Sequence, residues 1–172
     1  MSSIEGQLSN WHRGAQPLPF FMYIKRVKET HLPMATRSRI GIQLKDESVL
    51  SVYHHWDGYP EWLGRILKTH YNTKEKVEEL IDGGNMSSCW SDKIWGEKLP
   101  EGEYAPEYYT ARGEKIEDNA PRHDQTVEEY LANGEEYAYI FRDGEWVAYD
   151  CHESEDMWAP EIVRIPVDAL AC

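Results

Sequence analysis

The side chains best suited to chemistry are concentrated in the segment HHWDGY, which contains His54, His55 and Asp57. Imidazole and carboxylate groups are ligands that zinc and iron accept, and the end of a strand is a suitable place to present them. Residues 48–55 alternate as a strand does, however, so the two histidines should point to opposite faces and cannot easily bind one ion. We therefore predict no bound metal and no cofactor, with His54 beside the apolar face and Asp57 hydrogen-bonded within the turn.

A second pattern is Cys151 followed by His152, a possible nucleophile beside a base. A reactive thiolate needs a nearby positive charge or a helix N-terminus to lower its pKa, whereas the neighbours here are the carboxylates of Asp150, Glu153 and Glu155. The sequence has no CxxC pair, phosphate-binding glycine loop, GxSxG or HExxH motif. It therefore predicts no catalytic residue, and enzyme chemistry is unsupported rather than excluded.

Arginines and aromatic residues offer a more coherent binding site. Arg37 and Arg39 lie on the polar face of a predicted strand, across a hairpin from Tyr53 and His55. Guanidinium forks together with flat rings suit a nucleotide or another phosphorylated ligand. The alternative is cross-strand packing of arginine on tyrosine that merely covers the sheet. The candidate ligand-binding residues are Arg37, Arg39, Tyr53, His55, Trp56, Asp57 and Tyr59.

Composition and charge favour a binding protein over a nucleic-acid binder. The formal net charge is −13, which opposes the phosphate neutralisation that drives general nucleic-acid binding. The acidic excess lies after Tyr71, and the chain has seven tryptophans and eleven tyrosines. Three widely spaced cysteines and no membrane-length apolar run indicate free thiols in a reducing cytoplasm and no membrane contact. The candidate partner-binding residues are Glu101, Glu103, Glu153, Glu155, Asp156 and Trp158.

An N-terminal hairpin and two helices must position the first group of residues. Residues 36–45 and 48–55 alternate and predict the hairpin. Gly58 can supply the positive φ of a reversal, and Pro60 suits the first turn of a helix, so a helix should begin near Glu61. Its predicted inward stripe is Trp62, Leu63, Ile66, Leu67 and His70, with Gly64 beside it to admit another backbone.

The next helix, residues 74–81, should be capped by Thr73 and end at Gly83 and Gly84. Residues 85–113 are predicted to be irregular except for one strand at 108–111, and residues 114–124 to form a polar loop.

The C-terminal part has stronger local signals. The capping box at residues 126–129 predicts a short helix that reaches about residue 132 and stops at Gly134. Asp143 and Gly144 join two alternating runs, 136–142 and 145–151, and predict a hairpin. The tail from residue 152 should add a strand and a turn of helix.

The expected fold class is α+β, with antiparallel hairpins, two or three short helices packed on one face, and an irregular, aromatic-rich middle segment. Residues 1–33 mix small and polar types and are predicted to be a flexible arm or extension. Residues 34–172 should form a single domain, with Met34 as an alternative start.

The motifs TRSRIG at 36–41 and HHWDGYP at 54–60, with KVEELIDGGNMSS and the late RDGEWVAYD segment, resemble a family of small accessory proteins encoded by bacteriophages, including phages of cyanobacteria. Family members typically have CHWDGYP and an acid after the glycine, where this chain has His54 and Asn85. The match covers roughly residues 35–150. The resemblance supplies no catalytic residues and implies a viral protein in the host cytoplasm, where such proteins commonly act by binding.

Three functions follow in order of preference. The first is a binder that inhibits or modulates a host protein, in host takeover or anti-defence, with the acidic C-terminal part imitating nucleic-acid charge. The alternative is a protein that sequesters a nucleotide signal through the arginines and rings named above. The least favoured is a metal-dependent hydrolase built around His54 and His55, because strand alternation separates them.

Overall fold

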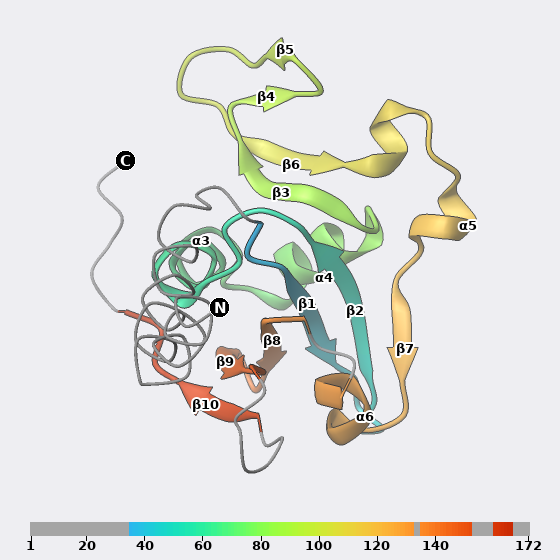
Figure 1. Cartoon of the computed structure of the whole chain (residues 1–172), viewed down its shortest axis with the longest axis vertical. Helices are drawn as coiled ribbons and strands as arrows, with labels where there is room; N and C mark the ends of the chain where they lie inside the picture. Colours follow the sequence, from blue (N-terminus) through green and yellow to red (C-terminus); the bar gives the residue numbers. More distant parts are fainter. Residues whose placement is uncertain (1–34, 133–134, 153–159, 167–172) are drawn as a thin grey trace, which may run out of the picture. The chain divides into compact units, whose positions relative to one another are not determined.

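A mixed sheet of eight strands carries the fold in this computed structural model, which describes residues 35–132, 135–152 and 160–166 (Figure 1). The strand order is β10-β9-β8-β1-β2-β3-β6, and β7 pairs with β2 outside this path. The strands are β1 (Ser38–Gln43), β2 (Val49–His54), β3 (Met86–Ser91), β6 (Ala105–Tyr108), β7 (Arg122–Asp124), β8 (Tyr137–Arg142), β9 (Glu145–Asp150) and β10 (Glu161–Val163), with β4 (Lys93–Ile94) and β5 (Glu97–Lys98) as a separate pair.

The helices are short and lie between the strands in the sequence. A π-helical turn, η1 (Pro60–Gly64), leads directly into α3 (Arg65–His70). The remaining helices are α4 (Lys74–Asp82), the 3₁₀ helix η2 (Tyr109–Arg112), α5 (Ile116–Asn119) and α6 (Val127–Ala132). The expected α+β class is confirmed. The described part of the chain belongs to one compact unit, residues 35–172. The flexible N-terminal extension expected at 1–33 lies outside the described residues.

Strand β1 joins the two halves of the sheet. It runs antiparallel to β2, with Ile40 opposite Val52, and parallel to β8, with Ile40 beside Tyr139. Residues 38–42 are all buried. The parallel pairing therefore places the N-terminal hairpin against the C-terminal hairpin of β8 and β9, which are distant in sequence.

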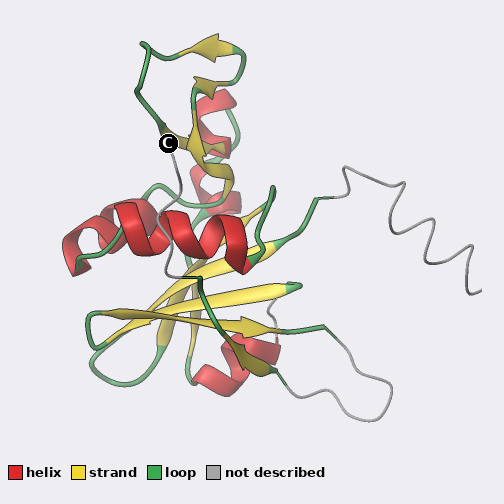
Figure 2. Cartoon of the chain, turned by 90° about the vertical axis from the view of Figure 1, so that its left-hand side faces the viewer, coloured by secondary structure: helices red, strands yellow, loops and turns green. Residues whose placement is uncertain are grey.

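Each face of the sheet has its own core. On one face, Ile40, Ile42 and Val52 pack against residues of η1, α3 and α4 such as Leu67 and Leu80. On the other, Val49, Ala138 and Ile140 pack against Tyr130 of α6. The prediction that helices pack on one face was therefore wrong in this respect, because α6 covers the opposite side; Figure 2 shows helices on both sides of the strands.

The turn after β2 differs in detail from the prediction. Asp57, not Gly58, has the positive φ, at 54°. Gly58 is needed for a close approach instead, since its N–H donates to Thr36 O at 2.8 Å and a Cβ there would lie 2.6 Å from the same oxygen. The helix begins at Pro60, as expected. Trp62 is 37% exposed and does not join the inward stripe, and Gly64 receives the side chain of Ile165 rather than a backbone.

The middle of the chain is more regular than predicted. Residues 86–91 form β3. The strand expected at 108–111 was wrong in position, because β6 spans Ala105–Tyr108 and a 3₁₀ helix follows it at Tyr109–Arg112. The polar segment 114–124 contains α5 and β7. Apolar alternation is weak in the sequences of these strands. They pair with β2 and with each other, and β3 also places Met86 and Cys89 in the core.

The local signals of the second helix and of the C-terminal part are confirmed. Thr73 Oγ1 accepts Lys76 N–H at the start of α4, and Thr126 Oγ1 accepts Glu129 N–H at 3.1 Å at the start of α6. Asp143 and Gly144 have φ values of 52° and 77°, the signs that a two-residue type I′ hairpin requires. The tail supplies the edge strand β10, while the predicted stop at Gly134 and helical turn after residue 166 lie outside the described residues.

Replacing Tyr139 by phenylalanine tests how the sheet holds the turn after β2. The fully buried Tyr139 hydroxyl donates to Gly58 O at 2.7 Å. Tyr139→Phe leaves that carbonyl without this donor, so we expect the free energy of unfolding to fall by about 1–3 kcal/mol, measured by urea denaturation.

Tyr137→Phe is the matched control. Tyr137 lies two residues earlier on the same strand and is half-buried, and none of the hydrogen bonds within the described ranges involves its hydroxyl. Its loss should cost less than about 0.5 kcal/mol. Equal losses in the two variants would show that the bond to Gly58 does not hold the turn.

Candidate functional site

Four residues at the end of β2 and the adjacent start of β1 form what we call the turn site: Arg37, Tyr53, His55 and Trp56. Tyr53 Oη lies 2.7 Å from His55 Nδ1, so the two side chains share a hydrogen bond. The rings of His55 and Trp56 pack edge to face, with their centroids 4.7 Å apart. The structure thus brings together four of the predicted ligand-binding residues at one place.

Backbone bonds to neighbouring strands fix this site. Tyr53 N–H donates to Asn85 Oδ1 at 2.9 Å, and Trp56 N–H donates to Ser87 O at 3.0 Å. Arg37 O accepts the N–H of Glu136 at 3.1 Å, which ties the residue before β1 to the residue before β8. The backbone that carries the four side chains is therefore tied to β3 on one side and to the start of β8 on the other.

The electrostatics of the turn site leave it with one charged group at neutral pH. Burial raises the pKa of the Tyr53 hydroxyl, although the nearby Arg37 opposes the rise. Burial lowers the pKa of His55, and Arg37 lowers it further. The phenol therefore keeps its proton and the imidazole stays neutral. The site can donate hydrogen bonds, present flat rings and attract an anion through Arg37, but it holds no nucleophile.

The prediction that Arg39 binds a ligand was wrong, because its guanidinium is buried. Its side chain is 7% exposed. Its Nε donates to Ser51 Oγ at 3.1 Å and its Nη2 to Ser51 O at 3.2 Å. Burial lowers its pKa, and the nearby Arg122 adds to that effect. Since α6 and β7 cover this end of the face, Arg39 stabilises the sheet instead of facing a ligand.

Asp57 and Tyr59 do not join the turn site. Asp57 is exposed, and within the described ranges its carboxylate makes no hydrogen bond, contrary to the prediction; it shapes the turn through its positive φ. Tyr59 is half-buried and precedes η1. Burial raises the pKa of its hydroxyl, as do Asp57 and Glu61.

The two adjacent histidines face different partners, as strand alternation predicts. His54 is 1% exposed and its Nδ1 lies 3.2 Å from Ser38 Oγ, whereas His55 contacts Tyr53. Burial, with a smaller effect of His55, lowers the pKa of His54 to about 3. Across the described ranges, no three His, Cys, Asp or Glu residues are placed to hold a metal ion.

Cys151 and His152 do not form a catalytic pair. Burial, helped by Asp150, raises the pKa of the Cys151 thiol to about 11. His152 turns to carboxylates instead, with Nδ1 2.6 Å from Asp150 Oδ1 and Nε2 3.6 Å from Glu136 Oε2. Burial also raises the pKa of the Cys89 thiol, so neither described cysteine is a thiolate at neutral pH.

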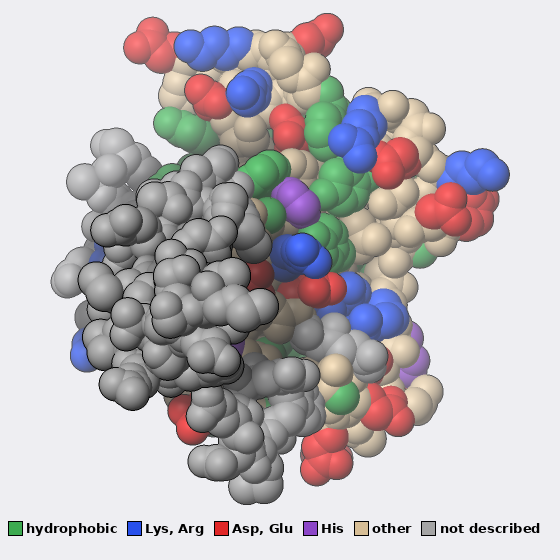
Figure 3. All heavy atoms as spheres, in the orientation of Figure 1, with side chains coloured by type: hydrophobic (Ala, Val, Ile, Leu, Met, Phe, Trp, Pro, Cys, Tyr) green, Lys and Arg blue, Asp and Glu red, His purple; other side chains and the backbone are tan. Residues whose placement is uncertain are grey.

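The second candidate surface is an arm, residues 92–104, that contains β4 and β5 and projects beyond β3 and β6 (Figure 1). Leu99 N–H donates to Asp92 O at 2.8 Å and closes its base. The arm presents acidic and basic side chains at the top of the face in Figure 3. Glu101 and Glu103, both predicted partner-binding residues, line a hollow of about 350 Å³ here. The hollow is separate from the turn site.

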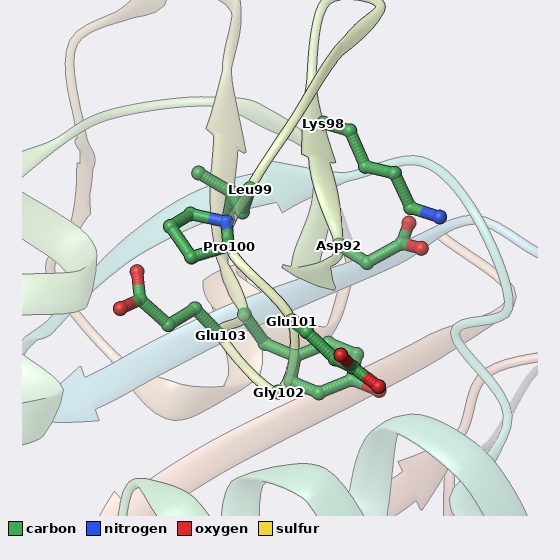
Figure 4. Close-up of a pocket in the computed structure, with 8 residues that line it drawn as sticks. Asp92, Lys98, Leu99, Pro100, Glu101, Gly102 and Glu103 are labelled. Carbon is green, nitrogen blue, oxygen red and sulfur yellow. The ribbon is translucent and has the colours of Figure 1, made fainter.

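Side chains around the hollow leave two carboxylates available. The Lys98 ammonium points toward the Asp92 carboxylate, whereas the side chains of Glu101 and Glu103 extend in different directions (Figure 4). Tyr104 completes the lining and is 45% exposed. The four other predicted partner-binding residues lie outside the described residues: Glu153, Glu155, Asp156 and Trp158.

Aromatic stacks that the sequence analysis did not identify support the arm on two sides. Trp90 lies between His70, with centroids 3.8 Å apart, and Tyr104, at 5.1 Å and with the planes 4° apart. Trp95 stacks on Tyr109 at 5.8 Å. The cluster of aromatic residues at 90–109 was the only signal available, and it does not reveal which rings stack.

The turn of the arm is held in an uncommon conformation. Trp95 and Gly96 have φ values of 47° and 92°, as a type I′ turn requires, although a bulky residue rarely adopts positive φ. Trp95 Nε1 donates to Tyr108 O at 2.8 Å, its N–H donates to Glu107 Oε2 at 3.0 Å, and Arg112 lies 4.4 Å above its ring. These contacts offset the backbone strain and fix the arm against β6 and η2.

Comparison with known proteins gave no match to a family model, a curated protein or a solved structure. Within the described ranges, none of the helices has the length and apolar character needed to span a membrane.

The pKa of His54 predicts how stability depends on pH. The unfolded imidazole titrates near 6.5 and the folded one near 3, so the unfolded state binds the extra proton between these values. The contribution of His54 is complete above about pH 6.5 and is lost as the pH falls toward 3. From pH 7 to pH 5 this group alone should lower the free energy of unfolding by about 2 kcal/mol.

Urea denaturation of His54→Gln at both pH values provides the measurement. The variant should be less stable at pH 7 but should lose about 2 kcal/mol less than wild type on acidification. His123→Gln, at an exposed position, is the control for the loss of an imidazole outside the core. If the stability of His54→Gln depends on pH as that of wild type does, the assignment is contradicted. It is also contradicted if the His54 imidazole of the folded wild type titrates near 6.5 by NMR.

Proposed function

We propose that this protein acts by binding another protein through the arm, and that it inhibits or modulates that partner. The resemblance to phage accessory proteins suggests a host protein in the host cytoplasm, bound during host takeover or anti-defence. The acidic, aromatic-rich composition of the chain supports a binder. The buried, protonated thiols of Cys89 and Cys151 and the separation of His54 from His55 provide no support for catalysis.

The observation that carries the proposal is a projecting element held in place by aromatic contacts while one of its rings stays open to solvent. Trp90 and Trp95 anchor the arm from two sides, yet Tyr104 remains 45% exposed. An element that is already ordered loses little conformational entropy on binding. Exposed tyrosine is among the residues most often found at the energetic centre of interfaces.

The charges around Tyr104 indicate the chemistry of the partner. Glu101 and Glu103 line the same hollow as Tyr104, and within the described ranges neither carboxylate takes part in an ion pair. Rim carboxylates attract a basic surface and accelerate association, while the buried centre supplies affinity. We therefore expect a partner surface with lysine or arginine side chains around an apolar or cationic group that covers Tyr104.

The test is capture of a partner from host lysate on wild-type protein and on two variants in parallel. Tyr104→Ala should weaken the retained complex by about 2 kcal/mol, or roughly thirtyfold, because the central contact is lost. A Glu101→Lys and Glu103→Lys double variant should bind more slowly and lose the dependence of binding on salt. Surface plasmon resonance with the purified partner measures both effects.

Trp56→Leu is the control, because Trp56 is 40% exposed but belongs to the turn site. It should retain the partner at wild-type affinity. A partner that binds the Tyr104 and glutamate variants as tightly as wild type would exclude the arm as the interface, and failure of wild type to retain any host protein at low salt would exclude the function.

A further inference from the structure

We propose that the turn site is a second binding site, separate from the arm contact, for a small molecule that combines a planar base with a phosphate, namely a mononucleotide. Three observations lead to this ligand class. The aromatic rings are open to solvent, the Arg37 guanidinium lies near them, and the side chains of Arg37 and Trp56 are not needed for strand pairing or for the cores.

The rings offer stacking surfaces that the fold leaves open. Trp56 is 40% exposed, and Tyr53 and His55 are partly exposed beside it. The ring centroids of Tyr53 and His55 are 5.9 Å apart, and those of His55 and Trp56 are 4.7 Å apart. A flat ligand ring that stacks on one of these rings would bury apolar surface without moving the backbone, because hydrogen bonds to Asn85 and Ser87 already hold it.

The cation is placed to meet an anionic group on the same ligand. Arg37 is exposed, and within the described ranges it takes part in no ion pair. It acts on Tyr53 more strongly than Glu135 or Glu136 does, and it also acts on His55. Arg37 therefore contributes positive charge at both rings in a chain with a net charge of −13, while Glu135 and Glu136 act in the opposite sense on Tyr53. A guanidinium beside neutral donors suits a phosphate, by charge-assisted hydrogen bonds.

Cross-strand packing does not require this arrangement. Arg39, which is buried and hydrogen-bonded to Ser51, already makes the cross-strand contact expected of the arginines. Arg37 and Trp56 lie outside β1 and β2, so neither contributes a ladder hydrogen bond within those strands or a core contact. The acidic chain disfavours a long polyanion, which selects a mononucleotide over a nucleic-acid strand.

Isothermal titration of the full chain with AMP and GMP, each up to about 1 mM, tests the site. We expect saturable binding of at least one of them, and at least tenfold weaker binding of adenosine or guanosine, which lack the phosphate, and of inorganic phosphate, which lacks the base. Arg37→Gln and Trp56→Leu should each raise the dissociation constant about tenfold or more, because the first removes the charge and the second removes the stacking surface.

Lys45→Gln and Tyr104→Leu are matched controls, one an exposed cation and the other an exposed ring away from the turn site. Both should bind the nucleotide as wild type does. Because Tyr104→Leu changes the arm and its stack on Trp90 but no residue of the turn site, loss of partner binding and loss of nucleotide binding are scored independently. Absence of saturable binding, full affinity in both turn-site variants, or a single-stranded oligonucleotide that binds more than tenfold tighter than AMP and GMP would overturn the proposal.

Discussion

The fold depends on burying one six-residue strand, β1, on both of its faces. Its alternate side chains enter different cores, with Ile40 and Ile42 toward α3 and α4 and Gly41 toward α6. Gly41 matters because a Cβ there would lie 2.9 Å from Val49 and 3.2 Å from the Tyr130 ring. The missing side chain lets Tyr130 approach the strand, where its hydroxyl lies 3.0 Å from Arg39 O and 2.8 Å from Tyr139 O. One helix is thereby attached to two adjacent strands.

What the sequence predicts well is what neighbouring residues decide among themselves. Asp143 and Gly144 favour their hairpin turn whatever surrounds them, and Thr73 and Thr126 satisfy the first amides of their own helices. The contact between Tyr53 and His55 belongs to the same class, since residues two apart on an extended chain lie on one face. The residues of the turn site could therefore be predicted, because they belong to one hairpin and the turn that follows it.

Other features depend on which distant segment arrives beside a residue. Alternation correctly placed Arg39 on the face opposite Ile40, but it carries no information on whether that face is covered; β7 and α6, from some 80 residues later, decide that it is. The arm shows the same limit. Trp90, Trp95 and Tyr104 are visible in the sequence as aromatic residues, yet their stacking with His70 and Tyr109 follows from the pairing of β3 with β6. Tertiary contacts of this kind override local preference.

The parallel pairing of β1 with β8 also determines the order in which the chain can fold as it is made. β1 ends at Gln43 and its partner begins at Tyr137, so one edge of β1 stays unpaired while almost a hundred residues are added. At ordinary rates of translation this interval is on the order of ten seconds. During that time the nascent chain carries a hydrophobic strand edge able to pair with a neighbouring chain. The same pairing that closes the finished sheet thus makes its production sensitive to crowding on the ribosome and to the supply of chaperones.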